Sequence, residues 1–200
     1  MCEANAGRSC AALVAVCALA AVCIGGHARA DESPRTGIQS YGVRVAYGSG
    51  DRHGLKFISL LPRVSLFLPD CIDQPLLAYD LHAEFVIEPI VSYITNATDS
   101  VEAGVNPLFF SLRYDRGQSL VPFVEGGEGV LYTALQNERL GESFQFSSQA
   151  GGGLHWFFDE HIALTASYRI RHISDAGLTG VNRGLNTDFF TVGVSVFPKR

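Results

Sequence analysis

The sequence predicts an all-β protein, an eight-stranded antiparallel transmembrane β-barrel. Residues after position 30 contain no apolar run that approaches the roughly 20 residues of a membrane-spanning helix. Hydrophobic residues nevertheless make up 47% of the chain, and charged residues only 18%. Apolar and polar residues alternate in segments of about ten residues or more, which is typical of strands with lipid on one side and a polar interior on the other.

The first 30 residues have the features of a secretory signal peptide. Arg8 precedes an apolar run over residues 10–24, and Ala28-Arg29-Ala30 matches the small-x-small cleavage pattern. The sequence therefore predicts a cleaved leader over residues 1–30 and a single barrel domain over residues 31–200. Cys71 is the only cysteine after the leader, so disulfides cannot cross-link the predicted barrel within itself.

Four alternating segments fill the first half of the predicted barrel, over residues 40–47, 56–68, 79–92 and 105–114. In the first, Tyr41 and Val43 alternate with Arg44, and in the third, Phe85 alternates with Glu84. Turn-forming residues separate the segments, and residues 69–75 are expected to turn the chain.

Four further segments span residues 121–134, 144–158, 162–174 and 188–197. The glycine-rich segment 121–134 leaves its inward face ambiguous. The clearest alternation is in 162–174, where Leu164 and Ile170 share one face and Arg169 and Arg171 share the other. An even number of strands, an exported chain and a C-terminal apolar strand together favour an outer-membrane barrel.

The polarity of the two faces separates a membrane barrel from a soluble lipid-carrying barrel, which would place its aliphatic face inside. The Arg, Glu and His side chains on the face opposite the aliphatic one fit a polar barrel interior better than the exterior of a soluble barrel. The expected interior network consists of Arg44, Arg63, Glu84, Glu88, Glu125, Arg169 and Arg171. The aromatic residues expected at the membrane interfaces are Trp156, Tyr168, Phe189 and Phe190.

His172 and Ser174 form a candidate base–nucleophile pair. Residues two apart on a strand point to the same face, and this pair shares the face of Leu164 and Ile170. The pair is therefore expected on the outer, lipid-facing side. Placing a histidine without a hydrogen-bond partner in hydrocarbon costs free energy, and a lipid substrate of the protein would explain this position. The same two-residue spacing also arises by chance, and histidine is common at membrane interfaces.

A hairpin centred on Gly180 would place Ser174 opposite Asn186 and His172 opposite Asp188. Asp188 could then orient His172, which could deprotonate Ser174, as in the Ser-His-acid arrangement of serine hydrolases. Asn186 would lie on the diagonal.

The stretch His172-Ile173-Ser174-Asp175-Ala176-Gly177-Leu178, followed by Asn182-Arg183-Gly184, resembles a known signature. It is similar to the His-x-Ser-Asn-Ala-Gly…Asn-x-Gly pattern of the outer-membrane lipid A 3-O-deacylases of the PagL type. The resemblance implies an eight-stranded barrel whose lipid-facing Ser-His-Glu triad removes the 3-position acyl chain of lipid A. It implies Ser174 as nucleophile and His172 as base.

Two positions depart from that pattern. Asp175 stands where the family has an asparagine thought to stabilise the oxyanion. An ionised aspartate here would repel a developing oxyanion. Asp175 must therefore be protonated or turned away, or backbone N–H groups near Ala176 and Gly177 must stabilise the oxyanion in its place. The family's acid aligns with Asn186, which can orient a histidine but carries no charge, and Asp188 is the expected substitute.

The sequence therefore predicts an outer-membrane serine esterase acting on lipid A or a similar acylated glycolipid, without a metal or other cofactor. A homodimer is left open, and the net charge of −5 gives no sign of nucleic-acid binding. The rival reading is a non-catalytic structural or adhesive barrel.

Overall fold

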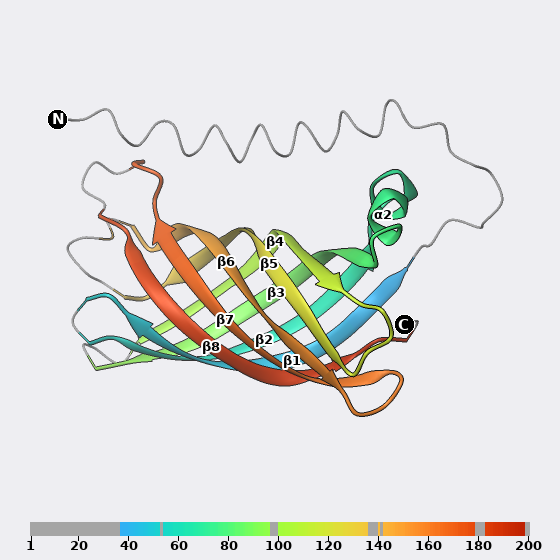
Figure 1. The fold of residues 1–200 in the computed structure, drawn as a ribbon. Coiled ribbons are helices and arrows are strands. Elements are labelled where there is room, and N and C mark those ends of the chain that lie inside the picture. The colour runs from blue at the N-terminus through green and yellow to red at the C-terminus, as the bar shows by residue number, and fades with distance from the viewer. Residues whose placement is uncertain are drawn as a thin grey trace.

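The computed structural model describes residues 37–52, 54–96, 100–135, 140, 142–178 and 183–198. The predicted leader, residues 1–30, lies outside them. Eight strands form the wall of a closed barrel (Figure 1). They are β1 (Ile38–Gly50), β2 (Lys56–Phe67), β3 (Leu81–Thr95), β4 (Ser100–Tyr114), β5 (Leu120–Thr133), β6 (Phe144–Phe157), β7 (Ile162–Ser174) and β8 (Leu185–Val196).

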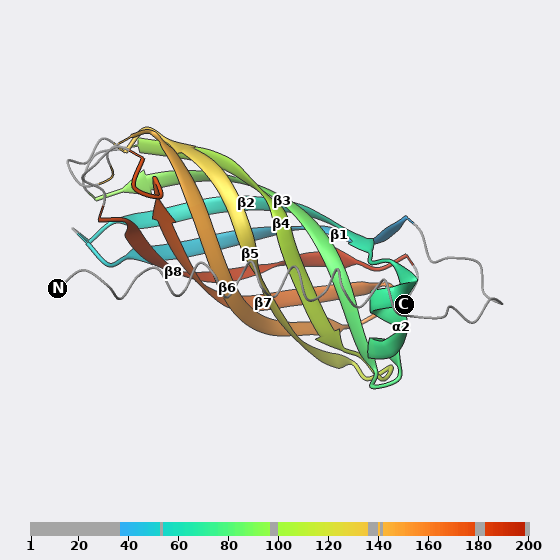
Figure 2. The same cartoon turned by 90° about the horizontal axis from the view of Figure 1, so that it is seen from above.

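Every strand pairs antiparallel with its sequence neighbours, and β1 closes the barrel against β8. The predicted eight-stranded antiparallel barrel is confirmed. The strands are strongly tilted, as Figure 2 shows. Strand β1 begins and strand β8 ends at one end of the barrel. We call the opposite end, where β7 ends and β8 begins, the distal end. No helix in the described part of the chain is long and apolar enough to cross a membrane.

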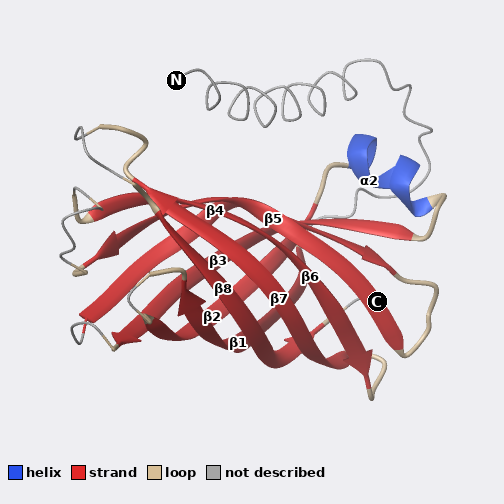
Figure 3. Ribbon diagram, turned by 60° about the vertical axis from the view of Figure 1, so that its left-hand side comes forward, coloured by secondary structure: helices blue, strands red, loops and turns tan. Residues whose placement is uncertain are grey.

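Several boundaries differ from the sequence prediction, and the largest difference is that β4 begins at Ser100, five residues earlier than expected. Strand β8 begins at Leu185, three residues earlier than expected. An α-helix, α2 (Asp70–Leu77), occupies the segment that was expected only to turn the chain (Figure 3). Asp70 and Asp73 lie in its first turn, where negative charge stabilises the positive end of the helix dipole.

The wall has apolar side chains outside and polar side chains inside. Val45, Val192 and Leu60 are among the large hydrophobic residues exposed on the outer surface, whereas the predicted interior residues are all buried. This polarity is the reverse of that of a soluble lipid-carrying barrel, so that alternative is wrong.

Glu125 lies at the centre of the interior charge network. It accepts hydrogen bonds from Arg44 at 2.9 Å, Arg63 at 2.7 Å and Arg169 at 2.6 Å, and Arg169 also binds Glu88. Arg171 pairs with Glu102, and Arg113 with Glu84. The predicted network is confirmed, because each buried charge has an opposite charge beside it.

The interior is also layered, which the alternation alone does not predict. Buried apolar side chains gather at the distal end, where Phe57, Phe189, Ile173 and Leu185 belong to one cluster. Phe189 was expected at a membrane interface, but it is buried inside and packs edge-to-face on Phe57. The prediction for Phe189 is wrong because it follows Asp188 on β8 and so faces inward.

Candidate active site

His172 projects outward from a firmly packed part of the wall. Its neighbour Ile173 faces inward, pairs with Leu185 of β8 and is buried in the distal apolar cluster. On its other side, the Arg171 guanidinium lies 4.8 Å from the ring centroid of Phe189. These inward contacts fix the backbone on both sides of His172, so its outward side chain starts from a defined position.

The partner of His172 on β8 is Asn186. The two residues are directly paired, and His172 Nδ1 lies 2.7 Å from Asn186 Oδ1. The expected pairing with Asp188 is wrong by two residues. In the observed register, Ile173 is buried against Leu185. A two-residue slip would preserve the alternation, so the sequence pattern cannot detect it.

Asp188 is engaged elsewhere. It lies opposite Ile170, and its Oδ1 accepts a hydrogen bond of 2.6 Å from the Tyr168 hydroxyl. Its side chain is exposed on the outer surface, as predicted, but it does not occupy the position opposite His172.

The free edge of the imidazole lies beside Gly184. A Cβ atom built on Gly184 would lie 2.8 Å from His172 Nε2 and 2.5 Å from Cε1. Continuing the β7–β8 register by one residue from Ile173 and Leu185 places Gly184 opposite Ser174. The absence of a side chain at 184 therefore keeps open the space beside Nε2, at the position opposite Ser174.

Asp175 is turned away from this space. It is buried, on the inward side, and its Oδ1 accepts the Gly177 N–H at 2.8 Å. The charge is thus removed from the outer surface, which is one of the three expected solutions. Gly177 is no longer a free oxyanion donor, which leaves Ala176 as the candidate in this turn; its φ of +56° is in the left-handed region. Asn182, part of the family signature, lies outside the described residues.

Three further residues, which the sequence did not indicate, join the site. Asp51, just beyond β1, accepts a hydrogen bond of 2.9 Å from Asn186 Nδ2. On the other side, Ser148 of β6 lies opposite His172 and donates a 2.7 Å hydrogen bond to Glu128 of β5. Five polar residues thus cross the outer surface of the distal half in one row: Glu128, Ser148, His172, Asn186 and Asp51.

An open cleft of about 490 Å³ follows this row and is lined by Glu128, Ser148, His172, Asn186 and Asp188, among others. Its floor includes the apolar Ala150 and Ile170. The cleft brings the candidate base and other polar groups beside apolar surface, and Ser174 is not among the described residues that line it.

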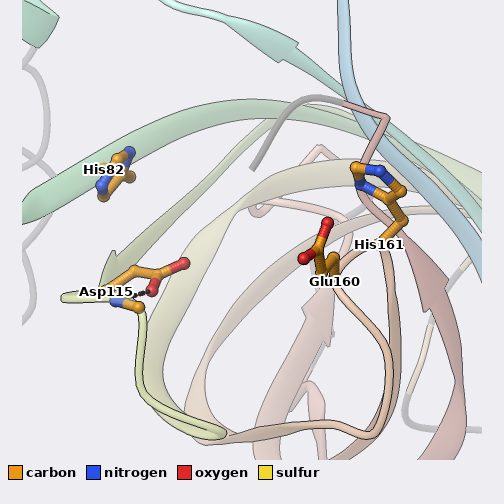
Figure 4. A pocket seen from close by; sticks show the side chains of 5 residues that line it. His82, Asp115, Glu160 and His161 are labelled. Carbon is orange, nitrogen blue, oxygen red and sulfur yellow. Dashed lines mark hydrogen bonds between the residues drawn. The ribbon is translucent and has the colours of Figure 1, made fainter.

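A second pocket, at the opposite end of the barrel, lacks such an arrangement. Figure 4 shows His82 and Asp115 on one side of it and Glu160 and His161 on the other. Asp115 accepts the Gly117 N–H at 2.9 Å, and no serine, threonine or cysteine is found among the described residues of its lining. Within the described ranges, no three His, Cys, Asp or Glu side chains are grouped so as to hold a metal ion.

Two solved barrels have a similar fold. The crystal structure of the outer membrane enzyme PagL is 20% identical, covers 76% of this chain and 97% of its own, and superposes with a TM-score of 0.61. Neisserial surface protein A is 16% identical, with a TM-score of 0.52 and coverage of 79% and 94%. No curated protein sequence matches. The family model for lipid A 3-O-deacylase (PagL) matches residues 72–195, and the chain therefore belongs to the PagL family.

Proposed function

We propose that this protein is an outer-membrane serine esterase that removes the 3-O-linked acyl chain from lipid A or a similar acylated glycolipid. The observation that carries the proposal is the outward-facing His172, held through Nδ1 by Asn186, with Nε2 directed toward Gly184, the next position in the register opposite Ser174. A soluble substrate would not require these groups on the apolar outer surface, whereas an acyl ester within the membrane reaches them there.

The proposed reaction follows the acyl-enzyme route. His172 Nε2 takes the proton of Ser174 Oγ, which attacks the ester carbonyl, and Ala176 N–H donates to the oxyanion. The protonated imidazole then returns the proton to the sugar oxygen as the C–O bond breaks. A water molecule, deprotonated by the same imidazole, hydrolyses the acyl-serine and releases the fatty acid.

The cleft also suggests how the substrate is held. Outward-facing carboxylates are costly on a lipid-facing wall, so Glu128 and Asp188 are proposed to face the polar sugar. Ala150 and Ile170 would contact the acyl chain. Export through the leader 1–30 and a homodimer remain predictions.

The test is mass spectrometry of lipid A from cells expressing the wild type, Ser174→Ala or Ser148→Ala. The wild type is expected to remove one 3-O-acyl mass, and Ser174→Ala to abolish this. Ser148, the other outward serine beside His172, is engaged with Glu128, so its alanine variant is expected to retain at least about a tenth of the activity. An activated serine also reacts with a fluorophosphonate probe, so labelling is expected on Ser174.

The second candidate is a non-catalytic barrel, favoured by the uncharged Asn186 at the acid position. An unchanged acyl pattern together with an unlabelled Ser174 would establish it.

A further inference from the structure

Asn186 leaves a specific chemical gap in the site. During catalysis the imidazole becomes a cation, which a neighbouring carboxylate stabilises and a neutral amide does not. Among the carboxylates of the cleft, Glu128 binds Ser148 and Asp188 binds Tyr168. Asp51 is the one that contacts Asn186 in the part of the chain that the structure describes.

The hydrogen-bonding capacities of the three side chains fix their orientation. A carboxylate only accepts, so Asn186 must direct its NH₂ group toward Asp51, 2.9 Å away. Asn186 Oδ1 then faces His172, and since this oxygen only accepts, His172 Nδ1 must carry the proton. In the neutral imidazole, Nε2 on the side of Gly184 is consequently the unprotonated nitrogen, as a general base requires.

The backbone holds Asp51 in this place. Asp51 N–H donates to Asn186 O at 2.9 Å, and Asn186 N–H approaches Asp51 Oδ1 at 3.3 Å. Arg52 ties the same loop to the loop before β8 by donating to Arg183 O at 3.1 Å. The contact therefore arises from closure of β1 on β8 and not from one flexible side chain.

We propose that Asp51 is a positioning residue that supplies the missing negative charge, acting on His172 through the amide of Asn186. The inference rests on the proposed esterase function. Asp51 sets the tautomer of His172 and stabilises its protonated form in the transition state. Its side chain is 36% exposed and Arg52 Nε lies 3.9 Å away, so solvent and this cation weaken the effect.

The central test compares Asp51→Asn with the exchanged pair Asp51→Asn/Asn186→Asp, using purified barrel in lipid vesicles containing lipid A. Asp51→Asn keeps an acceptor for Asn186 but removes the charge, and kcat is expected to fall about tenfold with KM nearly constant. The exchanged pair places the carboxylate directly on His172 and is expected to recover most of the loss. Glu160→Gln, the same charge change at the opposite end, is the control.

The pH profile separates this role from a purely structural one. A nearby negative charge favours imidazolium, so Asp51→Asn is expected to move the acidic limb of kcat/KM to lower pH by a few tenths of a unit. Glu128, Asp188 and the inward Arg171 line the same cleft as His172, and Arg52 lies beside Asp51, but all four are unchanged in this comparison. Wild-type kcat and an unmoved limb, or no recovery in the exchanged pair, would overturn the proposal.

A readout without turnover distinguishes the two proposals. Nitrogen-15 NMR of histidine-labelled protein, assigned with His172→Gln, reports the tautomer and titration of His172. A protonated Nδ1 and a titration that shifts in Asp51→Asn are expected even if lipid A is not cleaved, in which case only the esterase proposal fails. An active enzyme with an insensitive His172 would defeat the Asp51 proposal alone.

Discussion

Both faces of the barrel wall carry polar side chains, but these side chains have different surroundings on the two faces. Inside, Glu125 contacts three arginines, and protein partners satisfy the charges. Outside, the row from Glu128 to Asp51 lies next to an apolar surface, and its hydrogen bonds leave His172 Nε2 without a partner among the row residues, beside Gly184 and an open cleft. The difference is that the inner charges are neutralised within the protein, whereas we propose that the outer groups serve a ligand.

The largest expected effect tests the inner face. Glu125→Gln removes the common partner of Arg44, Arg63 and Arg169, and it should lower the free energy of unfolding by about 3–5 kcal/mol because the cations are left buried. Urea titration in lipid vesicles measures it. Glu128→Gln makes the same change on the outer face and should cost less than about 0.5 kcal/mol. Equal costs would contradict the comparison.

The next effect tests the space beside the imidazole. Gly184→Ala should lower activity by about a hundredfold, equivalent to about 2.7 kcal/mol of transition-state stabilisation, because the new methyl group would overlap His172. Gly54→Ala is the matched control, since Gly54 has a similar φ of +65° but nothing within 4 Å of its Cβ position. Similar losses in both variants would show that backbone strain alone is responsible.

A smaller effect is expected where the substrate sugar is proposed to lie. Glu128→Gln should raise KM by about three- to tenfold, because a charged acceptor is replaced by a neutral one, and leave kcat nearly unchanged. Steady-state kinetics on lipid A in vesicles measures both constants. A fall in kcat at constant KM would instead give Glu128 a role in the chemical step.

The smallest effect tests the corrected register. Asp188→Asn should change kcat by less than about threefold, because Asp188 binds Tyr168 and lies opposite Ile170. This loss should be clearly smaller than that of Asp51→Asn. The reverse order would restore Asp188 as the acid that the sequence suggests.

Much of the molecule follows from local sequence. Strict alternation over β7 predicts its bounds and the outward face of His172, because side chains alternate across any strand. Separation of charged from aliphatic faces likewise predicts the interior network around Glu125. The family signature indicates Ser174 and His172 because those residues are close in sequence.

What the sequence alone determined is therefore the barrel and its polarity, and it proposed the candidate nucleophile–base pair, of which His172 lies on the outer face. Tertiary structure decided the partners of that pair. Alternation is unchanged by a two-residue slip, so the choice of Asn186 over Asp188 appears only in the folded β7–β8 ladder, where Ile173 is paired with Leu185 and both are buried. Asp51 lies 135 positions from Asn186 in the chain, and no local pattern joins them. Closure of β1 on β8 brings the carboxylate to the amide, because a barrel must pair its first strand with its last.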